Sequence, residues 1–177
     1  MAIQQMFLGV VPSGVSGFYG ERGIFATGYD GGESNVIDYV NIASTGNFTD
    51  FGDLQVARRA GGCCTGSASA RMCIGGGYDQ GGNDGTSTQN VIGYITCAST
   101  GNATNFGDLT VKRYAVSACS STERGVWCFG QNESGNYTNH LDYVTIASTG
   151  NATDFGDRTV TGFGVGACSD VHGGLGD

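Results

Sequence analysis

A twelve-residue phrase occurs three times in this chain of 177 residues and constrains its fold more than any other feature. It reads IASTGNFTDFGD from Ile42, CASTGNATNFGD from Cys97 and IASTGNATDFGD from Ile146. A catalytic site is normally built once, whereas a phrase repeated in series is typical of a structural unit that stacks or circles. Equivalent alanines are spaced by 55 and then 49 residues, which is in the range of β-propeller blades.

Each repeat contains four candidate strands separated by glycine-rich or polar turns, so the sequence predicts an all-β fold. The first strand covers 111–121, with matches at 56–65 and 160–169, and the second strand begins at Arg22, Arg71 and Arg124. The third strand covers 37–45, 92–100 and 141–149. The fourth strand covers 53–56, 108–111 and 157–160. The third strand has apolar residues on both sides, which predicts neighbouring sheets on both faces. We expect the glycines at 46, 101 and 150 to adopt positive φ and the following asparagines to bond locally.

Composition excludes several other classes of protein. Glycine accounts for 33 residues and proline for one, but no G-X-Y period is present, which excludes collagen. Hydrophobic residues make up 39% of the chain, which argues against disorder. The formal net charge of −8 and the lack of a long apolar run predict neither a nucleic-acid partner nor a membrane partner.

The seven cysteines are the most reactive residues in the chain, and two interpretations of them remain open. Cys64 and Cys73, like Cys119 and Cys128, are nine residues apart on consecutive strands, so each pair is a candidate for a cross-strand disulfide. Alternatively, they are small buried hydrophobic residues that stay reduced. No CxxC, GxSxG or P-loop motif occurs and only two histidines are present, so we expect no metal, no cofactor and no catalytic residue.

The repeats resemble kelch repeats, in which a glycine doublet precedes a Tyr, an aromatic residue and an Arg. The residues that carry the resemblance are Tyr39, Phe51 and Arg58 in the first repeat, Tyr94, Phe106 and Arg113 in the second, and Tyr143 and Phe155 in the third. Phe stands where kelch repeats usually have Trp, and Gly162 replaces the third Arg. The resemblance implies a β-propeller of four-stranded blades.

The segment DYVTIASTGNATDFGD, together with ACSS and RGV in the strands before it, resembles kelch-like repeats in structural proteins of tailed phages of aquatic bacteria. That resemblance implies a non-enzymatic virion component, in the tail, a fibre or the capsid decoration, in contact with other virion proteins. The alternative is a propeller module that recognises a host-surface glycan or protein through the loops at 77–90 and 130–140.

The order of the repeats leaves the first unit incomplete. Residues 1–19 precede the repeats and are expected to form an extra strand or an anchor, and the three units cover about 20–58, 59–113 and 114–162. A last strand at 162–170 and a glycine-rich tail follow. Propellers usually have four to eight blades. The last strand could close a ring of three blades within the chain, or complete a neighbour's first blade; we expect the second, a homo-oligomer with six blades from two chains.

Overall fold

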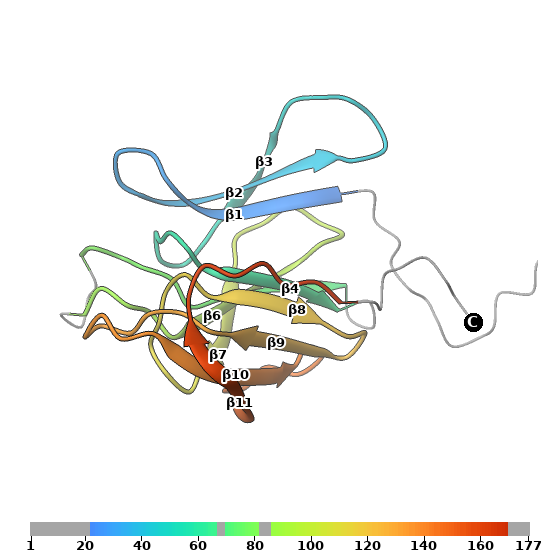
Figure 1. Cartoon of the computed structure of the whole chain (residues 1–177). Helices are drawn as coiled ribbons and strands as arrows, with labels where there is room; N and C mark the ends of the chain where they lie inside the picture. Colours follow the sequence, from blue (N-terminus) through green and yellow to red (C-terminus); the bar gives the residue numbers. More distant parts are fainter. Residues whose placement is uncertain (1–21, 67–69, 82–85, 170–177) are drawn as a thin grey trace, which may run out of the picture.

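The structure is a computed structural model that describes residues 22–66, 70–81 and 86–169, so the expected N-terminal segment at 1–19 lies outside it (Figure 1). The described residues form eleven strands and no helix, which confirms the all-β prediction. None of these residues forms a helix long and apolar enough to cross a membrane.

Three antiparallel sheets follow one another along the chain, and each strand pairs with its neighbour in sequence. The first sheet contains β1 (Arg22–Tyr29), β2 (Glu33–Asn41) and β3 (Thr49–Asp53). The second contains β4 (Gly62–Gly66), β5 (Arg71–Gly75), β6 (Val91–Thr96) and β7 (Thr104–Asp108). The third contains β8 (Ser117–Ser120), β9 (Arg124–Cys128), β10 (Thr138–Thr145) and β11 (Thr153–Gly162).

The sheets pack face to face in sequence order, with the second sheet in the middle (Figure 1). One apolar core lies between the first and second sheets and is built around Ile37, Phe51 and Ile74. The other lies between the second and third sheets and is built around Phe106 and Trp127. Only the middle sheet is therefore covered on both faces, whereas the sequence predicted covered faces for every repeat.

In the first two repeats the last strand precedes the position predicted for the fourth strand, whereas β11 (Thr153–Gly162) contains the predicted 157–160. β3 and β7 end at Asp53 and Asp108, where the sequence placed the start of the strand. The reason is that the glycine and asparagine of the repeated phrase form the loop of a hairpin, so the residues directly after them pair back onto the third strand. β11 begins at the equivalent Thr153 and continues to Gly162.

The predicted last strand does not complete the first sheet. Residues 163–169 form no strand, and β1 pairs only with β2 among the described residues, so the closure of a ring within the chain is not observed. The segment lies instead beside β8, where the Gly164 amide donates to the Ala115 carbonyl at 3.1 Å. The same bond, from the Ala115 amide to the Ala60 carbonyl at 2.8 Å, joins the starts of the two complete sheets. Residues 163–169 thus begin the next repeat.

Candidate functional site

The repeated phrase joins each sheet to the one before it. At the junction of the first and second sheets, the Gly101 amide donates to the Phe51 carbonyl at 2.8 Å, and the Ala103 amide donates to the Asp53 carbonyl at 2.8 Å. The Asp53 amide in turn donates to Asn102 Oδ1 at 3.0 Å. The turn of one sheet therefore clamps the edge strand of the preceding sheet, and the asparagine bonds across the junction rather than locally as predicted.

The second junction repeats this clamp. The Gly150 amide donates to the Phe106 carbonyl at 2.8 Å, and the Ala152 amide donates to the Asp108 carbonyl at 2.7 Å. The Asp108 amide donates to Asn151 Oδ1 at 3.1 Å. The middle copy of the phrase thus supplies both a donor turn toward the sheet before it and an acceptor edge toward the sheet after it, while the first copy supplies an edge and the third a turn.

The clamp explains why glycine precedes the aspartate of the phrase. Gly52 has φ of +147°, and a Cβ added there would lie 2.6 Å from the Gly101 backbone. Gly107 has φ of +154° and is even closer to the backbone of Gly150. Gly156 has φ of +131°, but an added Cβ would meet nothing within 4 Å, because no sheet follows the third one among the described residues. Glycine is therefore needed at the position before the aspartate. The prediction that Gly46 and Gly150 adopt positive φ is wrong.

A stacked arginine reinforces each junction. Arg22 lies over the Tyr39 ring at 4.8 Å and donates to the Cys97 carbonyl of the second sheet at 2.9 Å. Arg71 lies over Tyr94 at 4.6 Å and donates to the Ala147 carbonyl of the third sheet at 2.9 Å.

The third arginine of this series is Arg124, which lies over the Tyr143 ring at 4.9 Å. It donates to no carbonyl within the described part of the chain, because no sheet follows the third one. The acceptors at that position in the series would be the carbonyls at the end of another third strand.

The tyrosine and phenylalanine of the predicted signature lie edge to face in each sheet. The ring centroids are 6.0 Å apart for Tyr39 and Phe51, 5.9 Å for Tyr94 and Phe106, and 5.8 Å for Tyr143 and Phe155. The three pairs have the same geometry, but only the first two are covered by a following sheet.

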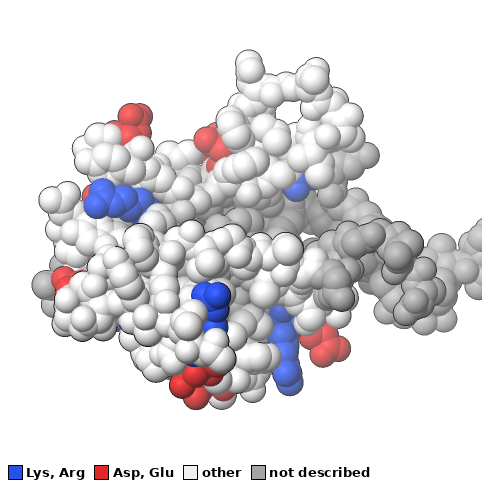
Figure 2. All heavy atoms as spheres, viewed as in Figure 1, with Lys and Arg blue, Asp and Glu red and all other residues white. Residues whose placement is uncertain are grey.

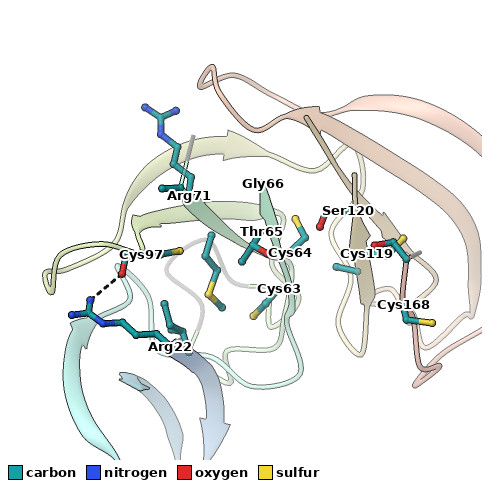
Figure 3. A pocket seen from close by; sticks show the side chains of 15 residues that line it. Arg22, Cys63, Cys64, Thr65, Gly66, Arg71, Cys97, Cys119, Ser120 and Cys168 are labelled. Carbon is teal, nitrogen blue, oxygen red and sulfur yellow. Dashed lines mark hydrogen bonds between the residues drawn. The ribbon is translucent and has the colours of Figure 1, made fainter. Parts of the chain in front are cut away.

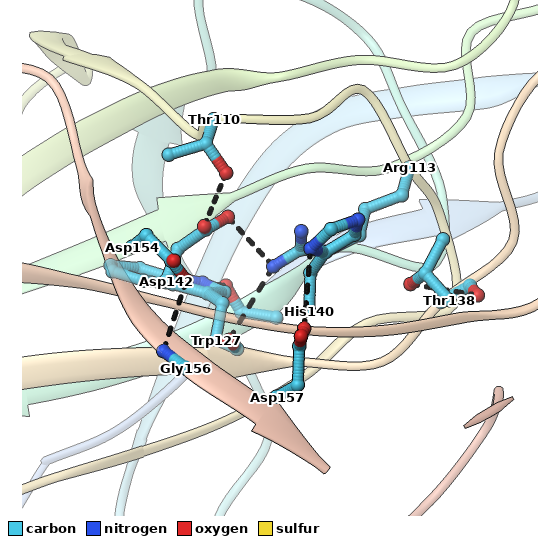
Figure 4. Close-up of polar contacts among 11 residues, drawn as sticks. Thr110, Arg113, Trp127, Thr138, His140, Asp142, Asp154, Gly156 and Asp157 are labelled. Carbon is cyan, nitrogen blue, oxygen red and sulfur yellow. Dashed lines mark hydrogen bonds and ion pairs between the residues drawn. The ribbon is translucent and has the colours of Figure 1, made fainter. Parts of the chain in front are cut away.

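The signature arginines are buried between sheets and have different partners. Arg113 pairs with Asp142 at 2.8 Å, both side chains are fully buried, and the Thr110 hydroxyl also donates to Asp142 (Figure 4). Burial lowers the pKa of Arg113, and Asp142 partly offsets this. Arg58 donates to the carbonyls of Val91 and Ile74 at 2.7 and 3.0 Å.

Arg58 has no carboxylate partner among the described residues. Burial lowers its pKa to about 10, because removal from water disfavours the charged form. The position equivalent to Asp142 in the second sheet is Gly93. The two junctions therefore share an arginine but not its acid.

The two outer faces of the sheet stack expose the groups that the junctions bury. We call the outer face of the first sheet the start face (Phe25, Asp38, Val40, Ile42 and Phe48) and the outer face of the third sheet the end face (Tyr143, Phe155 and Arg158). On the end face Phe155 is 51% exposed, whereas the equivalent Phe51 and Phe106 are 2% and 3% exposed.

The start face shows the same contrast from the other side of the junction. Ile42 is 69% exposed, whereas the equivalent Cys97 and Ile146 are 9% and 1% exposed. Phe25 and Phe48 are also exposed and contact each other edge to face at 5.1 Å. The start face and the end face are thus the two unpaired halves of one junction. Figure 2 shows charged side chains in separate small groups on a largely uncharged surface.

A pocket of about 410 Å³ lies among the first strands of the sheets (Figure 3). Five of its lining residues are cysteines: Cys63, Cys64, Cys97, Cys119 and Cys168. Burial raises the pKa of Cys63 to about 11 and that of Cys64 well above its ordinary value. The Cys63 and Cys64 thiols are therefore protonated at neutral pH, which makes them poor nucleophiles and poor metal ligands. Within the described ranges, no group of three or more His, Cys, Asp or Glu side chains could hold a metal ion.

The two candidate disulfides differ in register, and all seven cysteines are free thiols. Cys64 lies directly opposite Cys73. Cys119 lies opposite Val126, and Cys128 lies opposite Ser117, so the expectation that this second pair also faces across the strands is wrong. The reason is that the connection between β8 and β9 is shorter than that between β4 and β5, which shifts the pairing.

The two loops that the sequence singled out for ligand binding are tied to each other. The Glu133 carboxylate accepts hydrogen bonds from the amides of Thr88 at 2.8 Å and Ser87 at 3.0 Å. These bonds lower the pKa of Glu133. Another surface pair, His140 and Asp157, lies at 3.5 Å with both side chains largely exposed (Figure 4). Neither arrangement brings a nucleophile to an acid or a base.

Comparison of the chain with known protein families and with curated proteins finds no match. The junctions and the two outer faces are therefore the features of the molecule that bear on its function. Sequence reasoning placed Phe155 in the repeat signature, but it missed that this side chain is exposed. It also missed Arg124 and Asn47, although both occur in the repeat at the same positions as junction residues.

Proposed function

We propose that this chain is a non-enzymatic structural subunit that assembles with itself through its start and end faces. The observation that carries the proposal is the exposure of Phe155 and Ile42 at positions whose equivalents are buried in both internal junctions. Large exposed apolar side chains that gather on one face mark protein interfaces. A subunit that assembles also fits the described features of the chain, which are junctions between sheets rather than clusters of reactive side chains.

We further propose that the assembly is a kelch-like propeller in a phage particle, with each sheet acting as one blade. The resemblance of the repeated phrase to phage structural proteins supports this, as does the meander order shared by the two four-stranded sheets. Detection of the chain by mass spectrometry in purified virions tests the location, and its absence from them would contradict a virion role.

Light scattering on a sizing column tests the assembly. We expect masses that are multiples of 18.1 kDa and that fall on dilution. Phe155→Ala should weaken association, because it removes the central aromatic ring of the end face. Tyr29→Ala is the matched control, since Tyr29 is 58% exposed but lies outside both faces. A wild-type chain that stays at 18.1 kDa at every concentration would refute assembly and favour the binding-module alternative.

A further inference from the structure

The end face carries an arginine in the space that a buried arginine fills at each internal junction. Gly162 occupies the position of Arg58 and Arg113 and has no side chain to offer. Arg158 occupies the position of a buried leucine, Leu109 in the second sheet. A Cβ added to Gly162 would lie 3.9 Å from Arg158 Nη1. Although residue 162 is a glycine, the Arg158 guanidinium therefore lies close to where the Cβ of an arginine at position 162, the equivalent of Arg113, would be.

The start face carries the matching acid. Asp38 is equivalent to Asp142, the buried partner of Arg113, and lies in the middle of β2. Ile37 and Tyr39, on either side of it, belong to the core beneath the sheet, so Asp38 points outward. Asp38 forms no ion pair within the described part of the chain, which covers residues 22–66, 70–81 and 86–169.

We propose that Arg158 of one chain pairs with Asp38 of a second copy in a head-to-tail joint that repeats the internal junction. This inference rests on the proposed function, which requires only that the two faces associate. It adds the identity of the partner, the orientation of the joint and the ion pair at its centre. The joint is heterologous, because it uses a different face from each copy.

The remaining groups at the two faces complement each other in the same arrangement. The turn at Gly46 and Asn47 shares the Gly-Asn of the donor turns, with Phe48 in place of their alanine, and the edge at Phe155 and Asp157 has the sequence of the acceptor edges. The joint would seat this turn on that edge. It would also bring the Ile42 carbonyl of the second copy to the unpaired guanidinium of Arg124.

The end of the described chain fits the same joint. Residues 163–169 start beside β8 in the way that β8 starts beside β4, through the bond from Gly164 to Ala115. They therefore occupy the place of the first strand of another sheet. Among the described residues the first sheet of a second copy has three strands, and the edge of β1 that has no partner among them is where a first strand would pair. A heterologous joint of this kind generates a closed ring or a filament, depending on the rotation between copies.

Charge reversal tests the ion pair directly. Arg158→Asp or Asp38→Arg alone places like charges at the joint, and each should weaken self-association about 100-fold or more. The double variant restores opposite charges and should assemble like the wild type. An equimolar mixture of the two single variants should also assemble, since every joint in the mixture can then pair opposite charges.

Two further variants protect the test from trivial effects. Asp30→Arg makes the same charge change at an exposed loop residue outside both faces and should leave association unchanged. Arg158→Leu restores the residue found at 109 and should weaken association without creating repulsion. Circular dichroism of every variant verifies that the fold is retained.

The outcomes separate this inference from the proposed function. If the wild type assembles but the double variant and the mixture remain monomeric, the ion pair is wrong and self-assembly stands. If each single variant assembles as tightly as the wild type, the ion pair is likewise refuted. If the wild type is monomeric at all concentrations, both proposals fall.

Discussion

Gly93→Asp should stabilise the protein by supplying the acid that Arg58 lacks. Arg58 is 2% exposed and bonds only to carbonyls, whereas Arg113 at the equivalent place has Asp142. A Cβ added to Gly93 would lie 3.8 Å from Arg58 Nη2 and 3.6 Å from the Ala103 Cβ. These are ordinary contacts, as is the distance of 3.7 Å to Gln55 Oε1, so the Cβ of an aspartate fits without displacing its neighbours.

The expected gain follows from the pKa of Arg58. Burial lowers the pKa of Arg58 from its ordinary value to about 10. Each unit of pKa corresponds to about 1.4 kcal/mol, so keeping the buried charge costs about 3 kcal/mol. A carboxylate can offset that cost, but it loses its own hydration on burial, which leaves a net gain of about 1–2 kcal/mol. For a chain of this length the gain corresponds to a rise in Tm of about 3–6 °C.

The comparison with Gly93→Asn isolates the charge, because asparagine has nearly the same shape and the same effect on the unfolded chain. Thermal unfolding by circular dichroism at pH 7 should rank the aspartate variant above the asparagine variant. The partner arginine lowers the folded-state pKa of the introduced carboxyl group, so the stabilisation is present above about pH 4 and is lost as the pH falls through that lowered value. Equal Tm values at pH 7, or a difference that persists at pH 2, would refute the reasoning.

Three further predictions concern the junctions and the pocket. Phe106→Ala should lower the free energy of unfolding by about 3–5 kcal/mol, whereas Phe155→Ala should leave the melting of the isolated chain nearly unchanged, as calorimetry at low concentration would measure. Gly107→Ala should destabilise the chain strongly, because its φ is +154° and its Cβ would strike the next turn; a Tm within about 1 °C of wild type would contradict the clamp. Iodoacetamide at pH 8 should modify exposed Cys168 before buried Cys64, whose pKa is raised by burial, and peptide mass spectrometry gives the order.

Local features of the fold were predictable from the sequence, and contacts between repeats were not. Alternation in β2 and β6 and the turn residues between them predicted the meander, because those signals arise within a hairpin. The position of the last strand was missed in the first two repeats because Asp50–Asp53 and Asn105–Asp108 carry no alternating pattern of their own. The role of Asn102 was missed because an asparagine in a turn has the same sequence signature whether it bonds locally or to another sheet.

The exposure of the outer faces could not be predicted either, since equivalent residues have the same sequence pattern in a buried and an exposed sheet. Phe106 and Phe155 occupy the same place in the phrase and differ only in whether a sheet follows. Likewise, both cysteine pairs have a spacing of nine residues. The shorter turn before β9 nevertheless changes the pairing of β8 with β9, so that Cys119 lies opposite Val126 instead of Cys128. Burial and register depend on neighbours that lie about 50 residues away in this chain.

The threefold phrase has a physical basis in the clamp that it forms. Each phrase contains a donor turn, such as Gly101 and Asn102, and an acceptor edge, such as Phe106 to Asp108, so any copy can both follow and precede another. Three phrases in a row satisfy two junctions and leave one turn and one edge over. The free turn follows Ile42 and the free edge starts near Phe155, on opposite faces of the stack. If two copies associate through the same contacts that join the sheets within one chain, no separate interface is needed. The charge reversal at Arg158 and Asp38 tests whether copies of this chain associate in that way.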